Sequence, residues 1–594
     1  MKKLLRNLGN MIYLLRPYWR HRKLYCAVNL LNAVVIEPLP PLCNIALAKG
    51  VVDALIQGKP YADILRIAGF YVAVMLAVSM INWVIARAYQ DPKGGEIEMK
   101  INGSIYAQTL RTDYKYFDDP EFYNNFTWAA SEYAAKSKDA FACMLNTVNC
   151  FMRVASIAAL SAVLGPWVVI ISAVCIFVSF AMSLRLTKIN MRLKTEIVPR
   201  DRRMAYIHRV FYTNTNAANL KSTDAKRFLL DSYERAGRQR VGLFRKYAFV
   251  RVKWLWLRNV VGYANRFFSV AYAAFGVVRG NIADIGTYAA LVEASNEFIR
   301  ALLALLDNVT QMNELSLYAE KIRAFFELKS EIEVPRDTPA APVASGAFAV
   351  EIRDAGFGYA NSNFKLDGLN ISIKAGDKIG IVGENGAGKS TLAKLLLRLY
   401  DLQSGDILFN GTPIRDFDVR ELRRRIGIAF QSPNVYALPL SDNLRVYGAA
   451  DSAKLTEILA RVGLGKLLEK SGAMLDSEVT KEFDPNGIVL SGGEAQKLGL
   501  ARLLTADFGL ILLDEPSSAL DPIAEHEMTR LLFNRANTAT TIMIAHRLSS
   551  VRDADRIFLI DGGKVRECGT HDELVAANGR YAEMFAKQAA GYGR

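Results

Sequence analysis

The pattern of hydrophobic and polar positions divides the chain into two unlike halves. Six apolar segments lie before residue 307, and most approach or exceed the roughly 20 residues of a membrane-spanning helix. They cover residues 24–36, 64–88, 141–164, 167–184, 260–278 and 285–306. After residue 346 the apolar runs are short, as in the buried strands of an α/β domain. We therefore predict a membrane domain at residues 1–333, a linker at 334–346 and a soluble domain at 347–594.

Polar stretches interrupt the membrane half at two places. Residues 90–138 and 186–247 are too long for loops and rich in helix-forming residues, so the helices are expected to extend well into the cytoplasm. Their tips lie at about 114–126 and 205–222. The prolines of EPLPPLC, residues 37–43, predict a kink or break in the first membrane helix.

Charge placement predicts the orientation in the membrane. The connections IQGKPYAD, LGPW and VRGNIAD are short and nearly neutral, whereas the N-terminus and residues 185–203 are rich in Lys and Arg. Positive loops stay on the cytoplasmic side, so both termini and the soluble domain are expected there. This bias explains much of the net charge of +15, and we expect no nucleic-acid partner. The N-terminal segment has the spacing of an amphipathic helix on the inner membrane face.

The segment KIGIVGENGAGKSTL, residues 378–392, has the spacing of a phosphate-binding P-loop. It lies between a predicted strand and a predicted helix, whose N-terminal amides favour an anion. The lysine can reach the terminal phosphates of a nucleoside triphosphate, and Ser390 can ligate magnesium. The candidate phosphate-binding residues are Gly383, Glu384, Asn385, Gly386, Ala387, Gly388, Lys389, Ser390 and Thr391.

Two further motifs belong to the same chemistry. LILLDEP, residues 510–516, is an apolar run that ends in two carboxylates. Asp514 can complete the magnesium shell, and Glu515 can polarise a water molecule for attack on the terminal phosphate. In LSGGEAQ, Ser491, Gly492 and Gly493 open a predicted helix and present a second surface that favours phosphate.

In this order, the motifs resemble the ATP-binding-cassette family, and the layout resembles its exporter class over essentially the whole chain. The resemblance implies a six-helix all-α transmembrane domain with long cytoplasmic extensions, followed by an α/β P-loop ATPase cassette. It also implies roles for four residues. Tyr359 would stack on adenine, Gln431 would contact magnesium and the attacking water, His546 would contact the terminal phosphate, and Asp521 would belong to the loop that links two active sites.

Two features depart from the family pattern. Glu494 stands in the signature where glutamine is commoner, and the preceding stretch SEVTKEFDPNGIV is longer than is typical of exporters. Within that stretch, Glu482 is the candidate for the glutamate of the usual short loop. Glu515 is intact, so an active site for hydrolysis is expected.

The chain has one P-loop and one signature, whereas the family pairs the P-loop of one cassette with the signature of another. The resemblance therefore implies half a transporter that needs a second chain, identical or different, and that uses ATP and Mg²⁺. The tips at 114–126 and 205–222 resemble the coupling helices that dock on the cassettes. Simple interdomain packing is the alternative for these tips.

A polar layer is predicted near mid-depth of the membrane. Helical spacing places Asn146, Asn149 and Arg153 on one face of a helix, and the last helix carries a second group with Asn265 and Arg266 nearby. That second group comprises Glu293, Asn296, Glu297 and Arg300. Such residues either line the transport cavity and contact a polar or charged substrate, or form internal pairs that hold the helices together.

The sequence thus predicts an ATP hydrolase coupled to transport, in a bacterial plasma membrane and in contact with lipid. The expected function is export of peptides, lipids or amphipathic small molecules by alternating access. A subunit of the same fold that works as an importer is one alternative, and a non-transporting membrane sensor or regulatory ATPase is another. A soluble cassette protein of DNA repair or translation is disfavoured by the six apolar segments.

Overall fold

Contacts along the chain define two units in the computed structural model. The first unit comprises residues 1–110 and 121–328, and the second comprises residues 111–120 and 329–594. The structure describes residues 2–164, 166–279, 285–332, 340–359, 364–465, 474–516, 519–533 and 538–592. Residues 333–339 of the predicted linker thus lie outside the described residues. Each unit is described by itself below.

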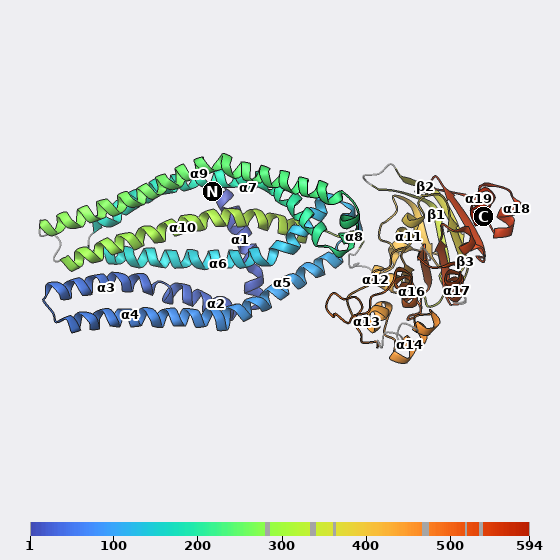
Figure 1. The fold of residues 1–594 in the computed structure, drawn as a ribbon, viewed down its shortest axis with the longest axis horizontal. Helices are drawn as coiled ribbons and strands as arrows, with labels where there is room; N and C mark the ends of the chain where they lie inside the picture. The colour runs from blue at the N-terminus through green and yellow to red at the C-terminus, as the bar shows by residue number, and fades with distance from the viewer. Residues whose placement is uncertain are drawn as a thin grey trace. The chain divides into compact units, whose positions relative to one another are not determined.

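The first unit is built from long helices (Figure 1). The helices α7, α9 and α10 contain 47, 54 and 42 residues. At about 1.5 Å per residue, each exceeds the roughly 30 Å hydrocarbon core of a bilayer, which confirms the predicted extensions. The bounds are α1 (Lys2–His21), α2 (Lys23–Leu31), α3 (Leu39–Ile56), α4 (Tyr61–Val84), α5 (Asp91–Arg111), α6 (Pro120–Leu164), α7 (Pro166–Tyr212), α8 (Asn214–Ser222), α9 (Ala225–Val278) and α10 (Ile285–Phe326).

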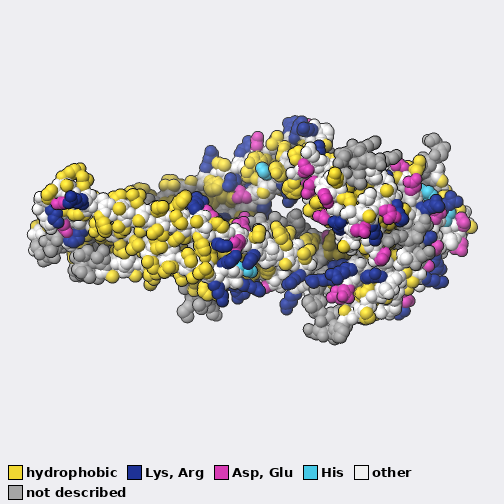
Figure 2. Space-filling view, turned by 90° about the horizontal axis from the view of Figure 1, so that it is seen from below, with side chains coloured by type: hydrophobic (Ala, Val, Ile, Leu, Met, Phe, Trp, Pro, Cys, Tyr) yellow, Lys and Arg dark blue, Asp and Glu magenta, His cyan; other side chains and the backbone are white. Residues whose placement is uncertain are grey.

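Three stretches of described helix are long and apolar enough to cross a membrane by length and composition: Lys23–Ile56, Tyr61–Arg111 and Glu132–Ala159. Figure 2 shows a broad band of hydrophobic side chains over the first unit, with Lys and Arg gathered beside it. The predicted spans in α9 and α10 are less apolar, because the first contains Asn265 and Arg266 and the second contains Glu293, Glu297 and Arg300. The predicted break in the first span is a π-helical turn, Asn32–Ile36, directly before the prolines.

The helix α10 is the centre of the first unit, since it contacts α1, α3, α7 and α9. Its buried face includes the small residues Ala290, Ala294 and Ser295 beside Leu291 and Phe298. Small side chains let helix backbones approach closely, which is how membrane helices gain packing energy without a hydrophobic driving force between them.

The second unit contains two sheets. One has the order β2-β1-β4-β5, and the other has the order β10-β9-β3-β8-β7-β6 with parallel pairing from β9 through β6. The strands are β1 (Val350–Gly358), β2 (Lys365–Ile373), β3 (Lys378–Val382), β4 (Ser404–Phe409), β5 (Thr412–Pro413), β6 (Ile426–Ala429), β7 (Leu510–Asp514), β8 (Thr540–Ile544), β9 (Arg556–Asp561) and β10 (Lys564–Gly569).

Helices pack on these sheets (Figure 1). They are α11 (Lys389–Leu396), α12 (Val419–Arg424), α13 (Leu440–Leu444), α14 (Ser452–Arg461), α16 (Gly492–Arg502), α17 (Pro522–Phe533), α18 (His571–Ala576) and α19 (Arg580–Tyr592). Two hydrophobic clusters form the core, one including Ile379 and Ile381, the other including Ile511 and Leu513. In parallel sheets, the residues that follow the carboxyl ends of adjacent strands meet at one edge. The segments after β3, β6, β7 and β8 therefore lie together.

Candidate nucleotide site

The phosphate-binding loop has a backbone that only glycine permits at its ends. Gly383 has a φ of +155° and Gly388 a φ of +104°, in the region that favours glycine. A Cβ on Gly383 would lie 2.1 Å from the carbonyl oxygen of Ile560, and one on Gly388 would lie 2.7 Å from Leu366 and Phe364 side-chain atoms. The two glycines thus let the loop turn tightly between β3 and α11.

Lys389 lies inside this loop. Its side chain is buried, and Nζ donates to the carbonyl oxygens of Gly383 at 2.8 Å and Glu384 at 2.9 Å. Burial lowers the pKa of Lys389, while the carboxylates of Glu515 and Asp514 oppose that shift. A bound anion would stabilise this ammonium group, because its oxygens would replace the hydrogen bonds to water that burial has removed.

Ser390 and Asp514 are adjacent, as predicted from the two motifs. Ser390 Oγ donates to Asp514 Oδ1 at 3.2 Å. Burial raises the pKa of Asp514, and the hydrogen bond from Ser390 opposes that shift. A hydroxyl and a carboxylate at the end of β7 are hard oxygen ligands, the kind that Mg²⁺ prefers.

Glu515 is held in an uncommon backbone conformation, with a φ of +50°. Its backbone N–H donates to the Ile544 carbonyl at 2.9 Å. Gln431 Nε2 donates to Glu515 Oε2 at 2.7 Å, and His546 Nε2 lies 2.5 Å from Glu515 Oε1. The structure thus brings together the three predicted catalytic residues, which follow three different strands.

A cavity of about 360 Å³ joins these groups. Its lining residues are Tyr359, Phe364, Asn385, Gly386, Gly388, Lys389, Ser390, Thr391, Glu515 and His546. The hydroxyl oxygens of Tyr359 and Thr391 lie 3.2 Å apart, so the candidate adenine-stacking ring borders the phosphate loop. Phe364, which sequence reasoning missed, faces Tyr359 with ring centroids 6.3 Å apart. The sequence around Phe364 contains no pattern that would identify it as a residue of the nucleotide site.

The signature segment begins α16 with a capping box. Ser491 Oγ accepts from the Glu494 N–H at 3.3 Å, and Glu494 Oε2 accepts from the Ser491 N–H at 2.8 Å. The unusual Glu494 therefore stabilises the start of this helix. Within the part of the chain that the structure describes, Ser491, Gly492 and Gly493 do not line the P-loop cavity.

Asp521 and Gln496 form hydrogen bonds with the backbone of the segment that follows Asp514 and Glu515. Asp521 Oδ1 accepts from the N–H groups of Ile523 at 3.0 Å and Ala524 at 2.9 Å, and so caps α17. Gln496 Oε1 accepts from the Ala519 N–H at 2.7 Å, which ties this loop to the signature helix. The communication role of Asp521 stays a prediction.

The C-terminal helix α19 contacts both sides of the site, a feature that sequence reasoning missed. Arg580 pairs with the Glu384 carboxylate in the P-loop. Gln588 Nε2 donates to the His546 carbonyl oxygen at 2.8 Å, and Gln588 Oε1 accepts from the Leu548 N–H at 2.9 Å. One amide side chain thus holds the backbone on both sides of Arg547.

Gln588→Ala should lower kcat about three- to tenfold, because each lost hydrogen bond contributes about 0.5–1.5 kcal/mol to the position of His546. The ATP dissociation constant should stay nearly unchanged, since Gln588 does not line the nucleotide cavity. Steady-state hydrolysis and equilibrium ATP binding measure the two quantities. Lys587→Ala, an exposed neighbour, is the matched control, and an unchanged kcat in Gln588→Ala would show that the helix does not position His546.

Part of the first predicted coupling tip belongs to the second unit. The short 3-10 helix Tyr114–Asp118 lies against residues that follow the P-loop. Tyr400 donates its hydroxyl hydrogen bond to Asp118, and the rings of Tyr114 and Tyr400 lie 5.7 Å apart. Lys394 of α11 lies over the Tyr114 ring at 5.3 Å. The second tip forms the end of α7 together with α8, in the first unit.

Tyr400→Phe should loosen this short helix, because it removes the hydroxyl that binds Asp118. Burial and that hydrogen bond both raise the pKa of Tyr400, so it remains a protonated donor. We expect about three- to tenfold faster hydrogen exchange at residues 114–118, measured by mass spectrometry. Tyr447→Phe, which removes a hydroxyl bound to Ile428 instead, should leave that exchange unchanged; equal rates in both variants would contradict the expected anchor.

The polar layer of the first unit is partly paired internally. Arg153 donates to Glu297 at 2.8 Å, and the Glu297 side chain is 4% exposed. Arg300 pairs with Glu297 at 3.2 Å and with Glu293 at 3.3 Å. Arg266 is exposed and forms no ion pair with any described residue. Among the described residues, the layer therefore contains both paired charges and an unpaired one, Arg266.

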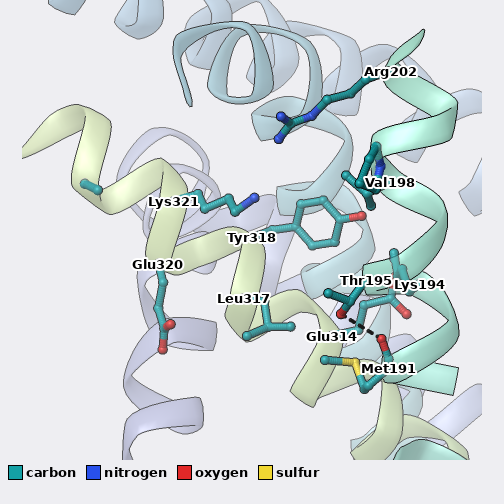
Figure 3. Close-up of a pocket in the computed structure, with 12 residues that line it drawn as sticks. Met191, Lys194, Thr195, Val198, Arg202, Glu314, Leu317, Tyr318, Glu320 and Lys321 are labelled. Carbon is teal, nitrogen blue, oxygen red and sulfur yellow. Dashed lines mark hydrogen bonds and ion pairs between the residues drawn. The ribbon is translucent and has the colours of Figure 1, made fainter. Parts of the chain in front are cut away.

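Another cavity, of about 510 Å³, lies where α7 and α10 extend beyond their predicted membrane spans. Figure 3 shows Tyr318 and Lys321 of α10 pointing toward α7. Lys194 pairs with Glu314 and lies over the Tyr318 ring at 5.0 Å, so its charge is satisfied within the wall. The helices α7 and α10 thus leave open space outside their predicted membrane spans.

The parallel sheet, the phosphate loop and the cluster around Glu515 define a P-loop ATPase, here joined in one chain to a helical unit with membrane-spanning segments. Residues 366–518 match the family model described as ABC transporter. The second unit therefore contains an ATP-hydrolysing cassette of the ABC transporter type, and the order of a helical unit followed by this cassette is the fold of ABC exporters. The predicted resemblance, fold class and ATPase activity are confirmed.

Relatives and a solved structure agree with this assignment. The chain is 26% identical over 568 residues to the subtilin transport ATP-binding protein of Bacillus subtilis, covering 94% of this chain and 91% of that protein. It is 35% identical over 312 residues to the beta-(1→2)glucan export ATP-binding/permease protein of Rhizobium johnstonii, and 34% identical over 316 residues to the glutathione/L-cysteine transport system ATP-binding/permease protein of Escherichia coli.

The last two alignments cover 52% and 53% of each chain, so this chain spans about half the length of those relatives. A bacterial Atm1-family ABC exporter with ATP bound shares the fold, with a TM-score of 0.78 at 22% identity, covering 95% of this chain and 98% of that one. The exporter layout therefore extends over nearly the whole chain.

Proposed function

We propose that two copies of this chain form an ATP-driven exporter in a bacterial plasma membrane, with both termini and the cassettes in the cytoplasm. The observation that carries this proposal is the incomplete site. The P-loop cavity contains the phosphate and catalytic groups but none of Ser491, Gly492 and Gly493 among the described residues. A second copy can supply that segment, and symmetric pairing completes two sites at once.

In the proposed complex, ATP lies between the P-loop of one copy and the signature of the other. Tyr359 stacks on adenine, and Lys389 with the loop amides holds the phosphates. The hydroxyl of Ser390, the carboxylate of Asp514 and the amide oxygen of Gln431 fit the oxygen ligands of Mg²⁺. When bound, this ion neutralises the charge of the phosphates. Asp521 lies in the loop that joins the two sites.

Hydrolysis depends on Glu515, which accepts hydrogen bonds and orients the attacking water for the terminal phosphate. Gln431 and His546 both contact this carboxylate, at 2.7 Å and 2.5 Å, and keep it at the end of β7. His546 also approaches the terminal phosphate. Gln588 and the Ile544 carbonyl, neither of which lines the cavity, hold the backbone of this cluster.

Nucleotide binding would close the two cassettes, and residues 114–118 would transmit that movement to the membrane helices. Hydrolysis would then reset the cycle, so that the cavity alternates between the two sides of the membrane. The relatives' names include subtilin transport, glucan export and glutathione/cysteine transport. They support a polar or amphipathic cargo.

The test is ATP hydrolysis by this chain alone, purified and placed in lipid nanodiscs. A homodimer should turn over ATP without any other protein, and discs that hold two copies should be active whereas discs that hold one copy should not. Bound ATP without turnover, in a folded sample, would contradict the homodimer and indicate a different partner chain.

A further inference from the structure

A polar cavity of about 460 Å³ lies between α9 and α10 in the first unit. Its walls include three arginines, Arg258, Arg266 and Arg300, together with two amide side chains, Asn259 and Asn296. The exposed ring of Tyr263 adds an aromatic surface. The volume is in the range of small-molecule sites in proteins, about 300–1,000 Å³.

The cavity lies near the middle of the predicted membrane spans. Arg266 precedes the end of α9 at Val278 by about 12 residues, and Asn296 follows the start of α10 at Ile285 by about 11 residues. At about 1.5 Å per residue, both lie roughly 17 Å from those helix ends, about half the bilayer core. A charge at this depth needs a partner or a water-filled cavity.

The local charges do not balance. Among the residues that line the cavity, three guanidinium groups, those of Arg258, Arg266 and Arg300, accompany one carboxylate, that of Glu293. Glu297 is shared by Arg153 and Arg300, Glu293 pairs with Arg300, and Arg258 Nη1 donates to Asp307 Oδ1 at 2.8 Å. The excess positive charge falls on Arg266, which has no ion-pair partner among the described residues. Arg258 Nε is also buried without a hydrogen-bond partner.

We propose that this cavity binds the carboxylate of a small organic anion, which is the cargo or part of it, with Arg266 as the principal contact. The inference rests on the proposed transport function and names its substrate class. Arg266 and the free Arg258 N–H can both donate to a carboxylate, a geometry that guanidinium groups favour. Asn259 and Asn296 can bind amide groups of the same molecule, and Tyr263 can cover an apolar part.

The test uses a matched pair of probes. Hippurate, N-benzoylglycine, has an aromatic ring, an amide and a carboxylate, whereas hippuramide replaces the carboxylate with a neutral amide. The full chain is held in nanodiscs of phosphatidylcholine, and its thermal unfolding midpoint is followed as each probe is added. Hippurate should raise the midpoint and hippuramide should not. This readout does not need ATP hydrolysis, so it can succeed or fail independently of the proposed function.

Variants assign the effect to Arg266. Arg266→Gln should weaken the apparent hippurate affinity about tenfold or more, because it removes the charged donor. Arg266→Lys should retain part of the affinity. Arg245→Gln, an exposed arginine of α9 outside the cavity, is the matched control and should bind hippurate like the original chain.

Three results would overturn the proposal. Hippurate that does not stabilise the chain, or does so equally in Arg266→Gln, would rule out carboxylate binding at this residue. Phosphatidylglycerol nanodiscs that stabilise the chain through Arg266, without an effect of hippurate, would assign the site to a lipid phosphate. A lower midpoint of Arg266→Gln before any probe is added, with unchanged hippurate affinity, would make Arg266 a contact within the protein or between two copies.

Discussion

Glu515→Gln should reduce ATP turnover by about 10²- to 10⁴-fold, the range that a positioned general base contributes. The glutamine has the same shape and can still contact Gln431, so the backbone with its φ of +50° and the fold should persist. It lacks the charged oxygen that accepts a proton from the attacking water. ATP binding should remain, because the phosphate loop is unchanged, and steady-state hydrolysis beside equilibrium binding measures both.

The control for this substitution is Glu527→Gln, which removes an exposed carboxylate from α17 of the same cassette. It should retain the original turnover. If Glu515→Gln still hydrolysed ATP within tenfold of the original chain, another group would have to activate the water, and the cluster of Gln431 and His546 around Glu515 would need a different explanation.

Lys389→Ala should weaken ATP binding by about 10- to 100-fold, the effect of losing charge-assisted hydrogen bonds of about 1.5–3 kcal/mol. Among the described residues, the buried ammonium donates to the carbonyls of Gly383 and Glu384, and burial lowers its pKa. A phosphate of ATP would provide the negative charge that stabilises the buried Lys389 ammonium group. Binding of a fluorescent ATP analogue to the chain in nanodiscs measures the change.

Lys564→Ala, at an exposed position of β10, is the control for the lost positive charge. It should bind the analogue as the original chain does. Equal affinity in Lys389→Ala and Lys564→Ala would mean that the P-loop lysine makes no direct contact with the phosphates.

Local patterns allowed the core of the nucleotide site to be predicted. The P-loop and the LILLDEP segment each begin with a strand, and both strands pair with β8 in the parallel sheet. Their carboxyl ends therefore lie at one edge, where Ser390 comes within 3.2 Å of Asp514. Gln431 and His546 have no comparable local signal. Their roles came from the family resemblance, and the structure brings both to Glu515.

Contacts between distant segments could not be predicted. Arg580 and Gln588 lie about 200 residues after the P-loop, and only the packing of α19 brings them to Glu384 and His546. Helical spacing identified the polar layer but could not show which of its charged residues form ion pairs, because the partners lie on a neighbouring helix. Arg153 meets Glu297 across α6 and α10, whereas Arg266 borders an open cavity. The Ser491–Glu494 capping box gives a structural reason for Glu494, which departs from the usual glutamine of the signature.

The most direct test of the central claim, that two copies complete each other's sites, mixes two inactive variants. Lys389→Ala weakens ATP binding, and Ser491→Arg blocks the signature, so homodimers of either variant should be nearly inactive at ATP concentrations well below the weakened dissociation constant of Lys389→Ala. A mixed dimer retains one intact P-loop facing one intact signature, and co-reconstitution at equal amounts should restore up to about a quarter of the original ATP turnover. A mixture that forms dimers yet stays as inactive as each variant alone would contradict the shared site.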